Sequence, residues 1–334
     1  MFNITSNAMR HLLLSLLYIL LFSQSAISQT DVTTQPDPTV DVVGYFAKND
    51  TLVYWINQSR WQLSPTDTVK IAGASTKVML TVADSTATGY KIDYTVLDVR
   101  ADSIFDSEVA SLLSRMTTEI AHQIVGTKIS FETDDLGAIT HFNNLDQIKQ
   151  QAESMLKAAI NSMIQTDALS KLAEPGIDLS KISEMIDTDR LIEGYLEEIR
   201  LIFLLHGLSF KEGQTQSHED ATDTAYENDT YTTATTDPED DTYSVAIDIV
   251  NIIPPAELKS LVGQLIDITT DTSLSESLNE AFDSQKVENC DYSSYFCSDY
   301  LSCGWPYRVI NQTTVTVNNQ GKSTQTYIYL DSIN

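Results

Sequence analysis

The sequence predicts an α+β fold, in which a curved antiparallel sheet carries an inserted helical layer packed on one face. Three observations predict this fold. Segments with strand-like alternation occur early and late in the chain. Short turn sequences join neighbouring strands, which favours antiparallel pairing. Between the two groups, apolar residues take the spacing of amphipathic helices, which we expect to cover one face of the sheet.

The early strands are predicted over Leu52–Ile56 and Trp61–Leu63, ahead of a turn at Ser64–Asp67. A hairpin follows, because apolar residues alternate with other residues over Val78–Val82 and again over Ile92–Val96. Alternation of this kind indicates strands with one buried face.

Helical spacing then replaces the alternation. Apolar residues form one stripe from Asp106 to Val125, and Gly126 follows as a stop signal. After a short hairpin over Lys128–Phe142, a long amphipathic helix is expected from Leu145 to Met163. The next helix, Asp189–His206, becomes apolar all round toward its end, which predicts that this end is buried.

The later part of the chain returns to strands. Tyr243–Ile249 alternates as a strand, and Ala256–Asp267 has helical spacing. Two further strands are predicted over Val309–Val317 and Ser323–Leu330, around a turn at Asn318–Gly321. We therefore expect the final segment to be a hairpin that joins the early strands in one sheet.

Residues 1–28 have the layout of a secretory signal peptide. Arg10 precedes an apolar run, Leu12–Phe22, and Ala26–Ser28 supplies the small residues of a cleavage site. The run is eleven residues long, whereas a membrane-spanning helix needs about twenty. A cleavable leader and an extracytoplasmic protein, periplasmic or secreted, are predicted. Met1 and Met9 both remain possible initiators.

The mature chain is expected to be soluble and to hold one domain. Its first residue is predicted to be Gln29 rather than the cysteine of a bacterial lipoprotein, and no transmembrane segment is expected after it. Residues 29–39 are predicted to be flexible, and residues 40–334 to form a single α+β domain. Residues 214–241, rich in Thr, Asp and Glu, are predicted to be an acidic low-complexity loop within that domain.

The charge balance excludes one class of partner. The formal net charge is -27, and removal of residues 1–28 takes away Arg10 and no acid, which gives -28. Because nucleic acids are bound through Lys and Arg, no nucleic acid partner is expected. Excess acid mainly favours solubility, and it permits cationic partners.

The sequence contains no motif that identifies an enzyme. Glu119 and His122 have a di-metal spacing, but His122 falls opposite the apolar stripe and no second copy completes the site. His206 ends a helix, and His218 lies in the acidic loop. Asp237–Asp241 lacks the order of a calcium-binding loop. We therefore predict no catalytic residue, no metal and no cofactor.

Three cysteines and several aromatic residues gather near the C-terminus. In an oxidising compartment, two of Cys290, Cys297 and Cys303 are expected to form a disulfide, with the pairing left open. The segment is then either a stapled aromatic platform that contacts a sugar or a partner, or a loop whose rings complete the core. The candidate contact residues are Tyr295, Tyr300, Trp305 and Tyr307.

Three short motifs resemble a known family. Lys77–Tyr94, Phe131–Asn144 and Gly304–Pro306 are similar to segments of uncharacterised extracytoplasmic proteins of Gram-negative bacteria, which are grouped as domains of unknown function. The alternating strands are also similar to the half-barrel sheet of periplasmic lipoprotein carriers, which cradle acyl chains. Neither resemblance implies an active site.

Two functions are therefore predicted. The first is a non-enzymatic binding or carrier protein, whose ligand is apolar or a glycan. The alternative is a structural or interaction component of the cell envelope that contacts another envelope protein. The partner itself is unknown.

Overall fold

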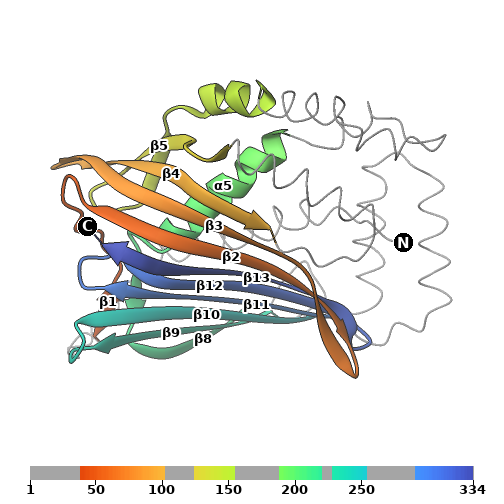
Figure 1. Ribbon diagram of the computed structural model, residues 1–334. Coiled ribbons are helices and arrows are strands. Elements are labelled where there is room, and N and C mark those ends of the chain that lie inside the picture. The colour runs from red at the N-terminus through yellow and green to blue at the C-terminus, as the bar shows by residue number, and fades with distance from the viewer. Residues whose placement is uncertain (1–37, 102–123, 155–187, 220–227, 254–289, 334) are drawn as a thin grey trace, which may run out of the picture. The chain divides into compact units, whose positions relative to one another are not determined.

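The computed structural model describes residues 38–101, 124–154, 188–219, 228–253 and 290–333 (Figure 1). The predicted signal peptide lies outside the described residues, as do most of the predicted flexible segment, the helix predicted from Ala256 and most of the one from Asp106. Of the helix predicted from Leu145, residues 145–154 are described, and they are helical.

The described chain is predominantly β, so the predicted α+β class with an inserted helical layer is wrong. One antiparallel sheet contains eleven strands in the order β6-β5-β4-β3-β2-β13-β12-β11-β10-β9-β8. Its strands are β2 (Thr51–Ser64), β3 (Asp67–Thr86), β4 (Gly89–Ala101), β5 (Lys128–Thr133), β6 (Ile139–Phe142), β8 (Gly213–Glu219), β9 (Asn228–Asp237), β10 (Thr242–Ile253), β11 (Cys290–Leu301), β12 (Pro306–Val317) and β13 (Gln320–Ile333).

The error has a physical reason, since several strands lack the apolar alternation of half-buried strands. Gln214–Asp241 was predicted to be a loop, yet β8 and β9 occupy most of its described residues. Their Thr and Tyr residues favour a pleated backbone, and β9 pairs with β10 on one side and with β8 on the other. Strand β11, in the cysteine-rich segment, was missed for the same reason.

The two strand-turn-strand units with the clearest alternation are confirmed. Strands β3 and β4 pair through a turn between Thr86 and Gly89. Strands β12 and β13 pair through the two residues Asn318 and Asn319, which have φ values of 50° and 62°. Asparagine tolerates such positive φ values, which a two-residue hairpin turn requires.

The buried helix is also confirmed. Helix α5 spans Thr188–Phe203, and Gly207 follows with a φ of 83°, a conformation that glycine adopts at little cost. We call the face of the sheet that α5 packs against the inner face, and the opposite one the outer face. The core consists of alternate strand residues on the inner face, among them Leu52, Tyr54, Ile56, Val78, Leu80, Ile92, Tyr94, Ile129, Phe131 and Ile328, with Ile199 and Ile202 of α5.

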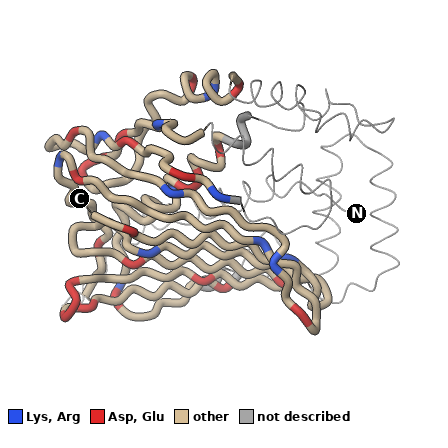
Figure 2. The backbone as a smooth tube through the Cα atoms, in the orientation of Figure 1, with Lys and Arg blue, Asp and Glu red and all other residues tan. Residues whose placement is uncertain are grey.

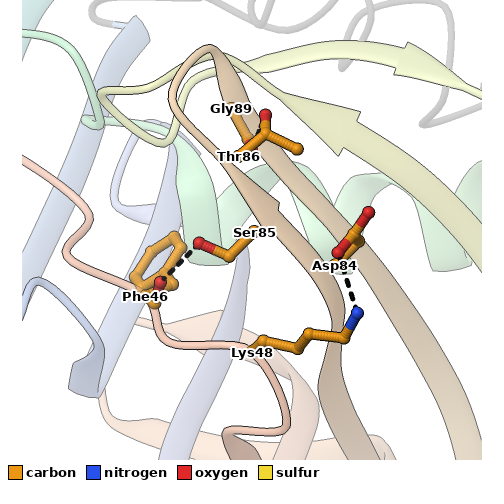
Figure 3. Close-up of polar contacts among 6 residues, drawn as sticks. All are labelled: Phe46, Lys48, Asp84, Ser85, Thr86 and Gly89. Atoms are coloured by element: carbon orange, nitrogen blue, oxygen red, sulfur yellow. Dashed lines mark hydrogen bonds and ion pairs between the residues drawn. The ribbon is translucent and has the colours of Figure 1, made fainter.

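An N-terminal arm, residues 38–50, is tied to the end of the sheet. Within it β1 (Thr39–Asp41) pairs with β7 (Ser209–Lys211) in a separate two-stranded sheet. Ser85 Oγ donates to the Phe46 carbonyl at 3.3 Å, and Lys48 Nζ lies 3.0 Å from an Asp84 carboxylate oxygen (Figure 3). The arm is thereby held against the β3–β4 turn.

Gly304 allows the arm to approach the turn between β11 and β12. Its φ is 84°, and a Cβ atom at this position would lie 2.1 Å from the Val43 carbonyl oxygen. The Tyr45 amide donates to the Cys303 carbonyl at 3.0 Å in the same contact. The close approach therefore depends on the absence of a side chain.

We predict that Gly304→Ala destabilises the protein more than Gly213→Ala. Both glycines have positive φ, but a Cβ at Gly213 meets nothing within 4 Å, so that variant loses only about 1 kcal/mol through backbone strain. Gly304→Ala adds a backbone clash and is expected to lose about 3 kcal/mol. Urea unfolding measures both changes, and equal midpoints for the two variants would show that the arm does not need this close approach.

Candidate ligand-binding face of the sheet

The inner face carries an apolar tract on β10, β11 and β12. Alternation places Val245, Ile247 and Ile249 of β10 on this face. Register places Phe296 of β11 beside Ile247, and Val245, Ile247 and Phe296 are buried. Tyr292, Val309, Val315 and Val317 extend the same face along β11 and β12.

One row of paired residues connects this tract to a group of three polar residues, Asn311, Thr326 and Gln58, which we call the polar centre. From Ile247 and Phe296 the row continues through Asn311 of β12 and Thr326 of β13 to Gln58 of β2. The inner face therefore changes along one line from hydrocarbon to amide and hydroxyl groups. Figure 2 shows that most of the sheet is uncharged and that many charged residues lie at its turns.

Glu198 of α5 meets the polar centre. Its carboxyl group accepts hydrogen bonds from Tyr94 Oη at 2.6 Å and from Gln58 Nε2 at 3.0 Å, and only 5% of the residue is exposed. Burial raises the pKa of Glu198 to about 8; the charge of Glu197 adds to the rise, and the Tyr94 hydrogen bond opposes it. The group is therefore mostly neutral at pH 7.

Helix α5 covers only part of the apolar face. From β4 to β10 the strand order has six spacings, which amount to about 29 Å at a strand separation of about 4.8 Å. The helix has 16 residues and is about 24 Å long, and its contacts reach from Phe131 of β5 to β12. Hydrogen bonds and ring contacts place α5 on Gln58, Tyr94 and Phe131, in the upper part of the sheet in Figure 1. The tract on β10 and β11 therefore continues the apolar face beyond these contacts.

A cluster of aromatic rings packs at one end of the sheet, next to the turn between β11 and β12. Phe46 stacks on Trp305 with centroids 4.0 Å apart, and Phe203 and Tyr300 pack around His206. The His206 Nε2 atom lies 3.0 Å from the Gly304 carbonyl oxygen. Burial lowers the pKa of His206 to about 4, so the ring is neutral at pH 7. This cluster is part of the core.

The structure separates the four predicted aromatic contact residues. Tyr300 and Trp305 are buried in the ring cluster. Tyr295 lies on the outer face and is 37% exposed, and Tyr307 lies half-buried at the β11–β12 irregularity. Because successive residues of β11 point to opposite faces, one platform does not form from all four. Their role as ligand contacts stays a prediction.

The predicted disulfide is absent, because Cys290, Cys297 and Cys303 are all free. Cys290 and Cys297 are seven residues apart on β11. In an extended strand this separation places their Cα atoms about 23 Å apart. A disulfide needs Cα atoms within about 7 Å. The extended strand therefore excludes that pair, one of those that the sequence left open.

The sequence reasoning missed Glu198, Tyr94 and Gln58 as a group. A local signal for Glu198 exists, since it stands three residues after Tyr195 and four before Ile202, on one helix face. An acid among the buried residues of a helix face indicates a polar partner on the opposing element. No local signal identifies Tyr94 and Gln58 as those partners, because both are more than 100 residues away in sequence.

The outer face has a different character. Register places Lys77, Trp55, Tyr329, Arg308 and Asp299 in one row across five strands. The Lys77 ammonium lies 5.3 Å from the Trp55 ring centroid and 2.9 Å from an Asp331 carboxylate oxygen. Arg308 forms an ion pair with Asp299. Two half-exposed rings therefore lie side by side between two cations on this face.

Among the described residues, no three His, Cys, Asp or Glu side chains are placed to hold a metal ion. None of the helices in the same part of the chain combines the length and apolar composition that crossing a membrane requires.

No family model and no curated protein matches the chain. A lipovitellin structure that concerns lipid–protein interactions is 8% identical, with a TM-score of 0.43 over 86% of this chain and 26% of that one. An outer-membrane channel from Pseudomonas putida F1 is 8% identical, with a TM-score of 0.16 over 89% of this chain and 100% of the channel. This chain thus spans about a quarter of the lipovitellin chain. The resemblance to uncharacterised Gram-negative proteins stays a prediction.

We predict that all three cysteines alkylate without prior reduction. Cys303 is partly exposed and is expected to react first. Cys290 and Cys297 react slowly in the folded protein, because burial raises the pKa of both thiols and the thiolate is the reactive form. Mass spectrometry counts the modified residues. If two of the cysteines react only after reduction, the predicted disulfide does form and this prediction is wrong.

We predict that acid destabilises the protein partly through His206. Its pKa is lower when folded than when unfolded, so protons bind the unfolded chain first, and the free energy of unfolding falls as the pH drops from about 6.5 to about 4. His206→Phe keeps a ring there and is expected to flatten this part of the pH dependence. Urea unfolding at several pH values measures the slope, and an unchanged slope in the variant contradicts this account.

Proposed function

We propose that this protein is a non-enzymatic extracytoplasmic carrier that binds the acyl chain of a lipid or lipid-modified ligand on the inner face of its sheet. The observation that carries the proposal is the row from Ile247 and Phe296 to Asn311, Thr326 and Gln58. Such a row combines buried apolar side chains, which suit a hydrocarbon chain, with hydrogen-bonding groups, which suit its polar end.

The energetics favour a long apolar ligand. Each methylene group removed from water contributes about 0.8 kcal/mol, so ten such groups contribute about 8 kcal/mol before the costs of association. The tract consists of Val, Ile, Phe and Tyr side chains. It suits an acyl chain better than a sugar, whose hydroxyl groups would lose hydrogen bonds with water there. The predicted similarity to lipoprotein carriers leads to the same ligand class.

The buried ionisable groups support a binding function over catalysis. Glu198 holds α5 to β2 and β4, and His206 holds the turn at Gly304. Each group thus has partners that explain it structurally. The two belong to separate clusters, one beneath α5 and one among the aromatic rings.

A second function has one observation in its favour. The outer-face row contains Trp55, Tyr329 and Arg308, and Trp, Tyr and Arg are the residues most enriched in the energetic centres of protein interfaces. An interaction component of the cell envelope would use this face. The two functions differ in the face that contacts the ligand, so variants on opposite faces separate them.

We predict that Ile249→Gln weakens acyl-chain binding and that Val250→Gln does not. The two residues are neighbours on β10, but Ile249 is on the inner face and half-buried, whereas Val250 is on the outer face and exposed. A loss of apolar contact worth about 1.4 kcal/mol would weaken binding about ten-fold. Titration of a fluorescent fatty acid measures the affinity.

Native mass spectrometry of protein purified without detergent complements the titration. Co-purified lipid in the wild type, reduced in Ile249→Gln and retained in Val250→Gln, supports the carrier. A wild-type protein that holds no lipid and does not bind the fatty acid contradicts it. If only Val250→Gln weakens fatty acid binding, the ligand contacts the outer face. That result would favour the interaction component of the cell envelope.

A further inference from the structure

We propose that Glu198 is a proton-dependent latch: its neutral carboxyl group keeps α5 on the inner face, and its ionisation releases the helix. The latch stands on the geometry of the interface between α5 and the sheet. What it controls, access of an acyl chain to the inner face, rests on the proposed function.

The latch joins α5 to two strands that are not adjacent. Tyr94 belongs to β4 and Gln58 to β2, and β3 runs between them in the sheet. One carboxyl group therefore fixes the helix at two points across a third strand. The neighbouring side chains Ile199 and Ile202 of α5 are fully buried, so movement at Glu198 exposes apolar surface of the helix.

The surroundings of Glu198 contain hydroxyl, amide and acidic groups. Tyr195 and Glu197 accompany it on α5, and the charge of Glu197 disfavours ionisation. On β3, Thr76 and Val78 occupy the inner face between the two partners.

Arg200 and Arg60 are positive charges of the described residues near this contact. Arg200 of the same helix forms an ion pair with Glu193 and lies over the Phe142 ring. Arg60, two residues after Gln58 on β2, has an exposed side chain. Two hydrogen bonds therefore hold the carboxyl group, and burial acts against its charge.

The direction of the pH response follows from the two environments. The pKa of Glu198 is about 8 beneath α5, against 4.5 for the ordinary group. The docked helix therefore binds a proton that the undocked helix gives up. Between about pH 4.5 and pH 8, each unit of rising pH shifts the equilibrium up to ten-fold toward the undocked helix. The ligand would be retained at the acidic end of this window and released toward its alkaline end.

Hydrogen exchange of the α5 amides tests the latch without any ligand. In the wild type, protection of residues 196–203, corrected for the intrinsic exchange rate, is expected to fall by up to ten-fold per unit between pH 5 and pH 8. Glu198→Gln cannot ionise and should show constant protection. Glu193→Gln, on the same helix, should behave as the wild type. A Glu198→Gln variant that keeps the wild-type pH dependence overturns the proposal.

Tyr94→Phe provides a second variant if Glu198→Gln folds poorly. It retains the ring but removes the hydrogen bond that lowers the pKa of Glu198, so the loss of protection should move to higher pH. An unchanged midpoint counts against the latch.

Fatty acid titration over the same pH range separates the latch from the proposed function. A pH-dependent helix in a protein that binds no fatty acid leaves the latch standing and removes the carrier function. If the protein binds the fatty acid but the protection of α5 does not change with pH, the carrier function stands and the latch is wrong.

Discussion

The structure depends on the alternation of side chains along continuously paired strands. Residues of the inner strands mostly have one neighbour on either side in register, and every second residue lies on the inner face. The pairing of eleven strands satisfies their peptide groups, and it also fixes which side chains meet in each row. On β11, Phe296 joins the apolar tract and Tyr295, the residue before it, faces outward. The core, the ligand-binding candidate and the outer aromatic row are therefore three results of one constraint.

Burial on the inner face has opposite effects on the pKa values of Glu198 and His206. It raises the pKa of Glu198 and lowers that of His206, since in both cases it disfavours the charged form. His206 lies among aromatic rings at the closed end of the sheet. Glu198 lies at a helix interface whose separation would expose an apolar surface. The same physical effect therefore stabilises a fixed core at one place and permits a pH-dependent contact at the other.

The predictable parts of this fold are those with strong local patterns. The β3–β4 and β12–β13 hairpins combine alternation with turn residues, and α5 combines a helical stripe with Gly207. Strands β8, β9 and β11 could not be predicted in this way. Their Thr, Ser and Tyr residues are tolerated on either face, so their sequence carries little periodicity. Pairing with neighbouring strands decides their conformation. The candidate site could not be predicted from local sequence either, because its row of residues crosses five strands.

By itself, the sequence determined the local elements and the charge: hairpin turns at positions where Asn and Gly accept positive φ, a helix with one fully apolar end, and a net charge of -27. Local backbone preferences and composition are sufficient for these. The tertiary structure decided the rest. Only register places Phe296 beside Ile247 and Gln58 in the same row, and only packing brings Glu198 to Tyr94, 104 residues away. An extended β11 separates Cys290 from Cys297, because distance along a strand grows with every residue.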